Sequence, residues 1–123
     1  MMLKAVFFDM GGTIDTFRYT REQRIVAVSA VRECLSRTGI IPTCSDAHLA
    51  DMITAGTSEY LRWNMVTNVE LKPAEIWSTY FLKDLHIDPA DLEPIAEELA
   101  FIYETRLFTR EMRPEIPEVL EEI

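Results

Sequence analysis

Apolar residues recur along most of the chain at the spacing of amphipathic helices. The first such stripe predicts a helix from about residue 21 to residue 38. Thr20 stands where an N-cap is expected, and Gln23 follows at the spacing of a capping box. The apolar residues of this stripe are Ile25, Val28, Val31 and Leu35.

Three further helices are indicated by the same reasoning. Ser45 can cap a second helix that reaches roughly Met65, and Pro73 stands at the start of a third. Asp88 and Pro89 mark the start of a fourth. Aromatic residues fall at helical spacing in these segments, so we expect a bundle core in which some of them could also line a substrate pocket. They are Tyr60, Trp63, Trp77, Tyr80 and Phe81.

The two ends of the chain have different patterns. Leu3 to Phe8 is a short run of β-branched and aromatic residues that stops at Asp9, which predicts a buried parallel strand. Residues 107–113 are short and mixed, and Pro117 then opens a last acidic helix whose apolar side chains should point inward. Those side chains are Val119, Leu120 and Ile123. The chain itself is therefore predicted to be mostly α, with one N-terminal strand.

A single buried strand raises a physical objection, because it leaves backbone donors and acceptors unpaired along both edges. We therefore expect either that more chain follows residue 123 or that another molecule pairs with the strand. Association with a second copy of the chain and pairing with a separate core portion both stay open.

Composition narrows the classes of function. The net charge is −9, from 21 acidic and 12 basic residues, so nucleic acid is not an expected partner. Cys34 and Cys44 form no Cys-x-x-Cys pair, which favours a reducing cytoplasm over a disulfide-built scaffold. Asp9 interrupts the only N-terminal apolar run, and no membrane association is expected.

Candidate chemistry lies directly after the predicted strand. Asp9 would stand just past the strand's C-terminal end, where open α/β sheets place their ligands. Gly11 and Gly12 permit a sharp turn close to a ligand, and Thr13 offers a hydroxyl that can hold the carboxylate. This arrangement suits nucleophilic attack by Asp9, although spacing alone is equally typical of a tight turn in which Asp9 caps backbone amides.

The segment from Val6 to Ile14, VFFDMGGTI, resembles the first motif of the haloacid dehalogenase (HAD) superfamily, an apolar strand followed by Asp-x-Asp-Gly-Thr. Members with a helical cap insert a bundle after this motif and return through a Pro-Gly-Val-like turn. The segment from Arg113 to Leu120 resembles that return turn, with Glu115 where glycine is usual. The resemblance thus implies an α/β Rossmann-like core whose first strand and nucleophile loop lie at 1–15. It also implies a helical cap at 16–106, and a return linker with the start of a core helix at 107–123.

The resemblance also implies roles for residues of the motif. Asp9 would be the nucleophile that forms an aspartyl intermediate, and it would bind Mg²⁺ together with the main-chain carbonyl of Gly11. Thr13 would orient the nucleophile, and Gly12 would permit the turn. The implied activity is Mg²⁺-dependent, phosphatase-type hydrolysis of a small phosphorylated or otherwise anionic metabolite.

Two departures from the family pattern leave a second hypothesis open. Gly11 replaces the usual second aspartate, whose loss as acid and base forfeits about 10² to 10⁴ in rate. The later catalytic residues of the family would all lie beyond Ile123, so this chain alone is expected to be inactive. The alternative is a non-catalytic helical module that serves interaction or regulation.

Other polar residues are weaker candidates. Arg18, Arg21 and Arg24 follow the motif and could bring positive charge to an anionic substrate, although a solvated helix face is the favoured interpretation. His48 and His86 lie in different predicted helices without metal-ligand spacing.

Overall fold

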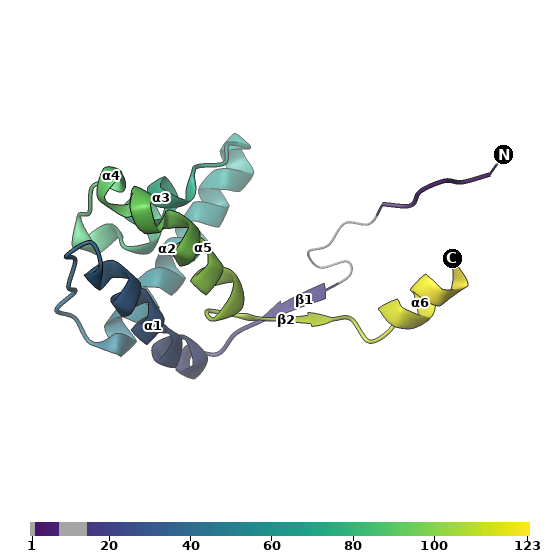
Figure 1. Cartoon of the computed structure of the whole chain (residues 1–123), viewed down its shortest axis with the longest axis horizontal. Coiled ribbons are helices and arrows are strands. Elements are labelled where there is room, and N and C mark those ends of the chain that lie inside the picture. The colour runs from purple at the N-terminus through teal and green to yellow at the C-terminus, as the bar shows by residue number, and fades with distance from the viewer. Residues whose placement is uncertain (1, 8–14) are drawn as a thin grey trace.

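The computed structural model describes residues 2–7 and 15–123. This part of the chain is mostly helical and contains one short two-stranded sheet. Figure 1 shows a helical body, a two-stranded ribbon that projects from it, and a last helix beyond the ribbon. The two strands of the described part are β1 Asp15–Arg18 and β2 Thr109–Met112. Its first two helices are α1 Arg21–Ser36 and α2 Asp46–Thr67, and its last helix is α6 Ile116–Glu122.

Helices α1 and α2 begin where local sequence signals predict. The Thr20 side chain accepts a hydrogen bond of 3.0 Å from the Gln23 amide, and Ser45 caps α2 in the same way, with 3.1 Å to the amide of His48. Helix α2 ends at Thr67, and the C-cap residue Asn68 adopts a left-handed conformation with φ of 55°. The Gln23 side chain does not complete a capping box and instead donates to Thr109 Oγ1 at 3.2 Å.

The third helical segment is continuous in the prediction but divided in the structure. It comprises α3 Pro73–Ile76, a π-helical turn over Trp77–Phe81 and a 3₁₀ turn over Lys83–Leu85. The Leu82 amide donates to the carbonyl of Trp77 at 2.8 Å, which is the wider bond of a π turn.

Gly56 of α2 lies directly against this π turn. A Cβ atom at Gly56 would come within 2.1 Å of the Tyr80 carbonyl oxygen, so only glycine allows the two backbones to approach this closely.

The fourth helical segment is also divided, into α4 Pro89–Leu92, a 3₁₀ turn over Glu93–Ile95 and α5 Ala96–Thr105. Pro94 explains the division, because proline has no amide for the helical hydrogen bond and its ring crowds the preceding turn. Asp88 caps α4 through a hydrogen bond of 2.9 Å from the Ala90 amide.

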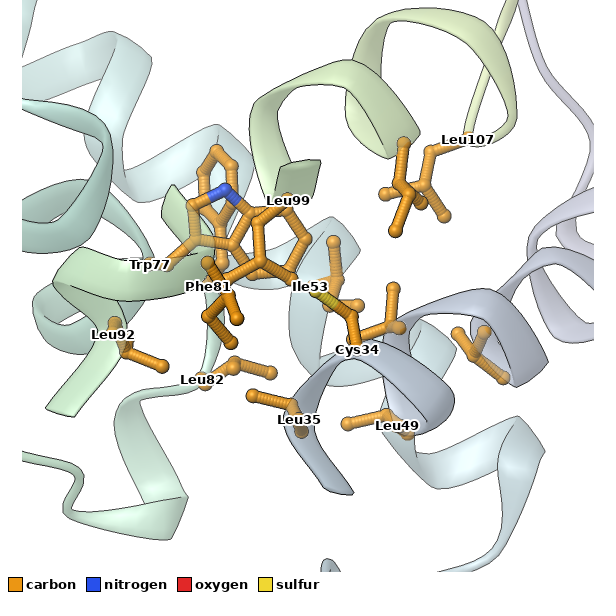
Figure 2. Packing of buried hydrophobic residues seen from close by; sticks show 14 of the residues in the cluster. Cys34, Leu35, Leu49, Ile53, Trp77, Phe81, Leu82, Leu92, Leu99 and Leu107 are labelled. Atoms are coloured by element: carbon orange, nitrogen blue, oxygen red, sulfur yellow. The ribbon is translucent and has the colours of Figure 1, made fainter. Parts of the chain in front are cut away.

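The core lies where α1, α2, the π turn and α5 meet (Figure 2). Trp77 and Phe81 are buried, as expected for core aromatics, and Tyr60 and Tyr80 pack against the cluster while partly exposed. Burial raises the pKa of the Cys34 thiol to about 11, so this cysteine is a packing residue. The large side chains that are fully enclosed include Leu35, Leu49, Ile53, Leu82, Leu92, Leu99 and Leu107.

Strands β1 and β2 form an antiparallel ribbon that the sequence did not predict. Asp15 pairs with Met112, and Arg18 pairs with Thr109. The chain therefore enters the helical body and leaves it at the same place (Figure 1).

Two expectations for the chain ends are wrong for the residues that the structure describes. Residues 2–7 form no strand and are exposed, with Leu3 at 80% and Phe7 at 92% of full exposure. A strand needs neighbours for its amides, and the described residues provide none here. Val119 and Leu120 of α6, and Ile123 directly after it, do not point into a core, because α6 lies beyond the ribbon and away from the helical body (Figure 1).

Candidate functional site

The residues of the motif, Asp9, Gly11, Gly12 and Thr13, lie outside the described part of the chain. The described residues form a cleft where the ribbon joins the helical body. Its volume is about 390 Å³. We call it the ribbon cleft, and its walls include Phe17, Tyr19, Arg24, Thr54, Tyr103 and Phe108.

Arg24 is the central charged group of the ribbon cleft. The residue retains only 3% of its exposure, so its guanidinium is held inside the protein. Its Nε donates to the carbonyl of Leu107 at 2.9 Å, and its Nη1 donates to Thr54 Oγ1 at 2.9 Å. The Tyr19 ring lies against the guanidinium, with 3.6 Å from Cζ to the ring centroid.

This buried charge has no carboxylate partner among residues 2–7 and 15–123. Burial lowers the pKa of Arg24, but an arginine side chain remains protonated at neutral pH. A buried cation is costly unless an anion compensates it. Since the planar guanidinium matches carboxylate and phosphate groups, the ribbon cleft is chemically suited to an anionic ligand.

Aromatic rings form the walls around Arg24. Phe108 contacts Phe17 and Tyr103 edge to face, with centroid distances of 5.2 Å in both pairs. Burial raises the pKa of Tyr103, so its phenol is neutral at physiological pH. At the rim, Arg110 lies over the Phe17 ring and pairs with Glu104 at 2.9 Å. The ribbon cleft therefore has aromatic walls next to one buried positive charge, and the charged rim residues Glu104 and Arg110 are paired with each other.

A second cleft of about 240 Å³ opens between α2, α3 and α5, and we call it the inner cleft. Ile76, Trp77 and Phe81 line it, and Trp77 and Phe81 meet edge to face at 5.1 Å. The inner cleft and the ribbon cleft share four wall residues and thus border one another. These residues are Thr57, Leu61, Tyr103 and Glu104.

The three arginines that follow the motif have different environments. Arg18 pairs with Glu111 across the ribbon, and Arg21 pairs with Asp51 at 2.9 Å. Both pairs are exposed, and Arg21 lies on a solvated face of α1 as expected, whereas Arg18 lies on strand β1 and not on a helix. The hydrogen bond from Arg21 keeps the pKa of Asp51 below its usual range.

For Arg24 the expectation of a solvated helix face is wrong. A signal in the sequence could have placed it, because Arg24 precedes Val28, Val31 and Leu35 at helical spacing and so belongs to the buried stripe of α1. The remaining cleft residues carry no such signal, since they come from separate segments that only folding brings together.

The described residues contain no group of side chains of the kind that binds a metal ion. Among those residues, no three of the types His, Cys, Asp and Glu come together as a metal site. His86 ends the 3₁₀ turn in a left-handed conformation with φ of 53°, and His48 lies in the first turn of α2. Asp9 and Gly11, the Mg²⁺ ligands that the resemblance implies, lie outside the described residues.

Comparison with known proteins found no counterpart: no family model, no curated protein and no solved structure matches the chain. In the part of the chain that the structure describes, every helix is too short or too polar to cross a bilayer.

Proposed function

We propose that the chain is the nucleophile segment and helical cap of a HAD-like, Mg²⁺-dependent hydrolase that acts on a small anionic metabolite. The structural observation that carries the proposal is the buried guanidinium of Arg24, which borders a cleft and lacks a carboxylate partner among the described residues. An anionic substrate would supply the missing negative charge.

The ribbon supports the idea that the helical body is an insertion. A module inserted into a loop of another domain needs its first and last residues close together. The pairing of Asp15 with Met112 brings them together. Phe17 and Phe108 then attach the ribbon to the body beside Arg24. The ribbon cleft is thus lined in part by β1, the strand that follows the Asp9 motif in the sequence.

In the proposed reaction, a carboxylate oxygen of Asp9 forms a bond to phosphorus, or to carbon in an otherwise anionic substrate, and the leaving group departs with its bonding electrons. Water then hydrolyses the aspartyl intermediate and regenerates the carboxylate. Mg²⁺, when bound by Asp9 and the carbonyl of Gly11, would offset charge on the transferring oxygens. Thr13 would orient Asp9, and Gly12 would allow the turn. Gly11 stands where the family has its general acid and base, so another group would have to transfer the proton.

The competing proposal is a non-catalytic interaction module. Gly11 favours it, because glycine cannot transfer a proton. The exposed apolar side chains of residues 2–7 and of α6 also favour it, since such surface is typical of protein interfaces.

The deciding experiment measures hydrolysis of p-nitrophenyl phosphate with and without Mg²⁺. It compares this chain with the longest natural product of its gene, each as wild type, as Asp9→Asn and as the control Asp84→Asn, which removes an exposed carboxylate elsewhere. Mg²⁺-dependent hydrolysis that disappears in Asp9→Asn and persists in Asp84→Asn would support the hydrolase. Absence of hydrolysis in both forms, with no stabilisation by Mg²⁺, would leave the interaction module.

A further inference from the structure

We propose that the two clefts together bind an amphipathic anion, with its single anionic group at Arg24 and an acyl or aryl body extending into the inner cleft. This inference relies on the proposed function only where it calls that ligand a substrate. The binding site itself consists entirely of described residues of the helical body and the ribbon.

The continuity of the clefts is the first argument. Leu61 and Tyr103 are walls of both, so a ligand can pass from one cleft to the other without leaving the protein surface between α2 and α5. Leu61 is about half exposed, at 53%, and so leaves apolar surface open beside both clefts. An apolar ligand body would cover it.

The charge distribution is the second argument. The guanidinium of Arg24 makes hydrogen bonds to a carbonyl and a hydroxyl, which satisfy donors but bring no negative charge. Glu104, the acidic wall residue, is already paired with Arg110. One anionic group would balance Arg24, whereas several would be repelled by a protein of net charge −9.

The inner cleft has largely apolar walls, which favours an apolar ligand body over a sugar. Its walls include Pro73, Ile76, Trp77 and Phe81, and the Thr57 hydroxyl is already engaged with the carbonyl of Ile53 at 2.8 Å. The hydroxyl groups of a sugar would lose water here and gain few partners, which is unfavourable. An alkyl chain or an aromatic ring loses no such hydrogen bonds.

The test uses the full chain and isothermal titration calorimetry with octyl phosphate as the probe. Inorganic phosphate and 1-octanol serve as the two half-ligands. We expect octyl phosphate to bind about tenfold or more tightly than either half-ligand, because only it fills both clefts. Binding of 1-octanol as tight as that of octyl phosphate would overturn the role of Arg24. Equal binding of inorganic phosphate would overturn the role of the inner cleft.

Variants assign the site to residues. Arg24→Gln should lower the affinity for octyl phosphate about tenfold or more, through loss of a charge-assisted contact. Because Arg24 is buried and its replacement affects folding, Leu61→Glu provides an independent test on an exposed side chain. It places a negative charge in the shared wall and should weaken binding similarly, whereas the matched change Met65→Glu, on the same helix outside both clefts, should not. Equal affinities for Leu61→Glu and Met65→Glu would refute the proposed location.

Parallel measurements of binding and of hydrolysis on the wild-type protein separate this inference from the proposed function. If octyl phosphate binds and no form hydrolyses phosphate esters, the amphipathic-anion site stands and the hydrolase falls. If hydrolysis occurs with no preference for octyl phosphate over phosphate esters with polar bodies, the hydrolase stands and this inference falls.

Discussion

A core of apolar side chains is buried in the helical body, whereas apolar side chains are exposed in the segments outside it. In the body, the stripes of α1, α2 and α5 meet one another, and leucines such as Leu35, Leu49 and Leu99 have no exposure at all. Outside it, Phe7 and the apolar residues of α6 are largely exposed. The same kinds of residue therefore stabilise one region and leave the other without a core, because burial of apolar surface needs a second surface.

The ribbon stands between these two regions. Its strands form backbone pairs, yet all four residues of β2 are exposed. Its contacts with the body include the Phe17–Phe108 ring pair, the hydrogen bond from Gln23 to Thr109 and the ion pair of Arg110 with Glu104. An isolated two-stranded hairpin is marginal in water. We therefore expect the ribbon to depend on the body for its order, and the body to tolerate a loosened ribbon.

The comparison predicts its largest effect for truncation of a core leucine. Leu99→Ala removes a fully buried side chain of α5 and should lower the free energy of unfolding by about 3 to 4 kcal/mol. The matched change Leu120→Ala in α6 should cost less than about 0.5 kcal/mol, because that side chain is 44% exposed. Urea denaturation measures both, and similar losses would show that α6 shares the core's stability.

Gly56→Ala should have the next largest effect. The new methyl group would collide with the Tyr80 carbonyl, which is backbone and cannot rotate away, so α2 and the π turn must separate at a cost of about 2 to 3 kcal/mol. Helix propensity alone would instead stabilise by about 1 kcal/mol. The exposed neighbour Ala55→Gly calibrates that propensity term in the same denaturation series, and a stabilised Gly56→Ala protein would contradict the close contact.

Phe17→Ala should loosen the ribbon and leave the body intact. It removes the edge-to-face contact with Phe108 and the contact with Arg110, together about 1 to 2 kcal/mol. Hydrogen exchange should accelerate at the amides of β1 and β2, with no change in α1, α2 and α5. Faster exchange throughout the helices would mean that the ribbon supports the body after all.

The smallest effect concerns an exposed ion pair and depends on pH. Arg37 donates to both carboxylate oxygens of Glu98, at 2.5 and 2.6 Å, and this keeps the pKa of Glu98 below its usual range. Stability from a lowered carboxyl pKa is present above the unfolded pKa and is lost as the pH falls through the folded one. Glu98→Gln should therefore be slightly less stable than wild type at pH 7, and the difference should shrink toward pH 3. The neighbouring Glu97→Gln is the control, and a difference that does not change with pH would argue against the ion pair.

Sequence reasoning succeeded where local interactions determine the structure. The N-caps Thr20 and Ser45 each bond to an amide three residues ahead, so α1 and α2 could be placed from their own residues. It failed where distant segments decide the outcome. The division at Trp77–Phe81 accompanies the contact with Gly56, and the ribbon depends on pairing between residues almost a whole chain apart.

The same distinction applies to the candidate sites. The Asp9 motif is contiguous, so sequence alone could propose its chemistry. The ribbon cleft combines Arg24 of α1 with Thr54 of α2 and the carbonyl of Leu107, and no spacing in the sequence connects these three. Only the helical position of Arg24, on the stripe that packs inward, could have marked it as an unusual arginine.

The closure of the helical body by its own ribbon has a practical consequence for protein engineering. A segment whose two ends are already hydrogen-bonded to each other can be transplanted into a surface hairpin of an unrelated host with little distortion at the junctions. Residues 15–112 can therefore be moved into another protein as one unit. The proposed anion site at Arg24 would then be carried into the host together with the helical body.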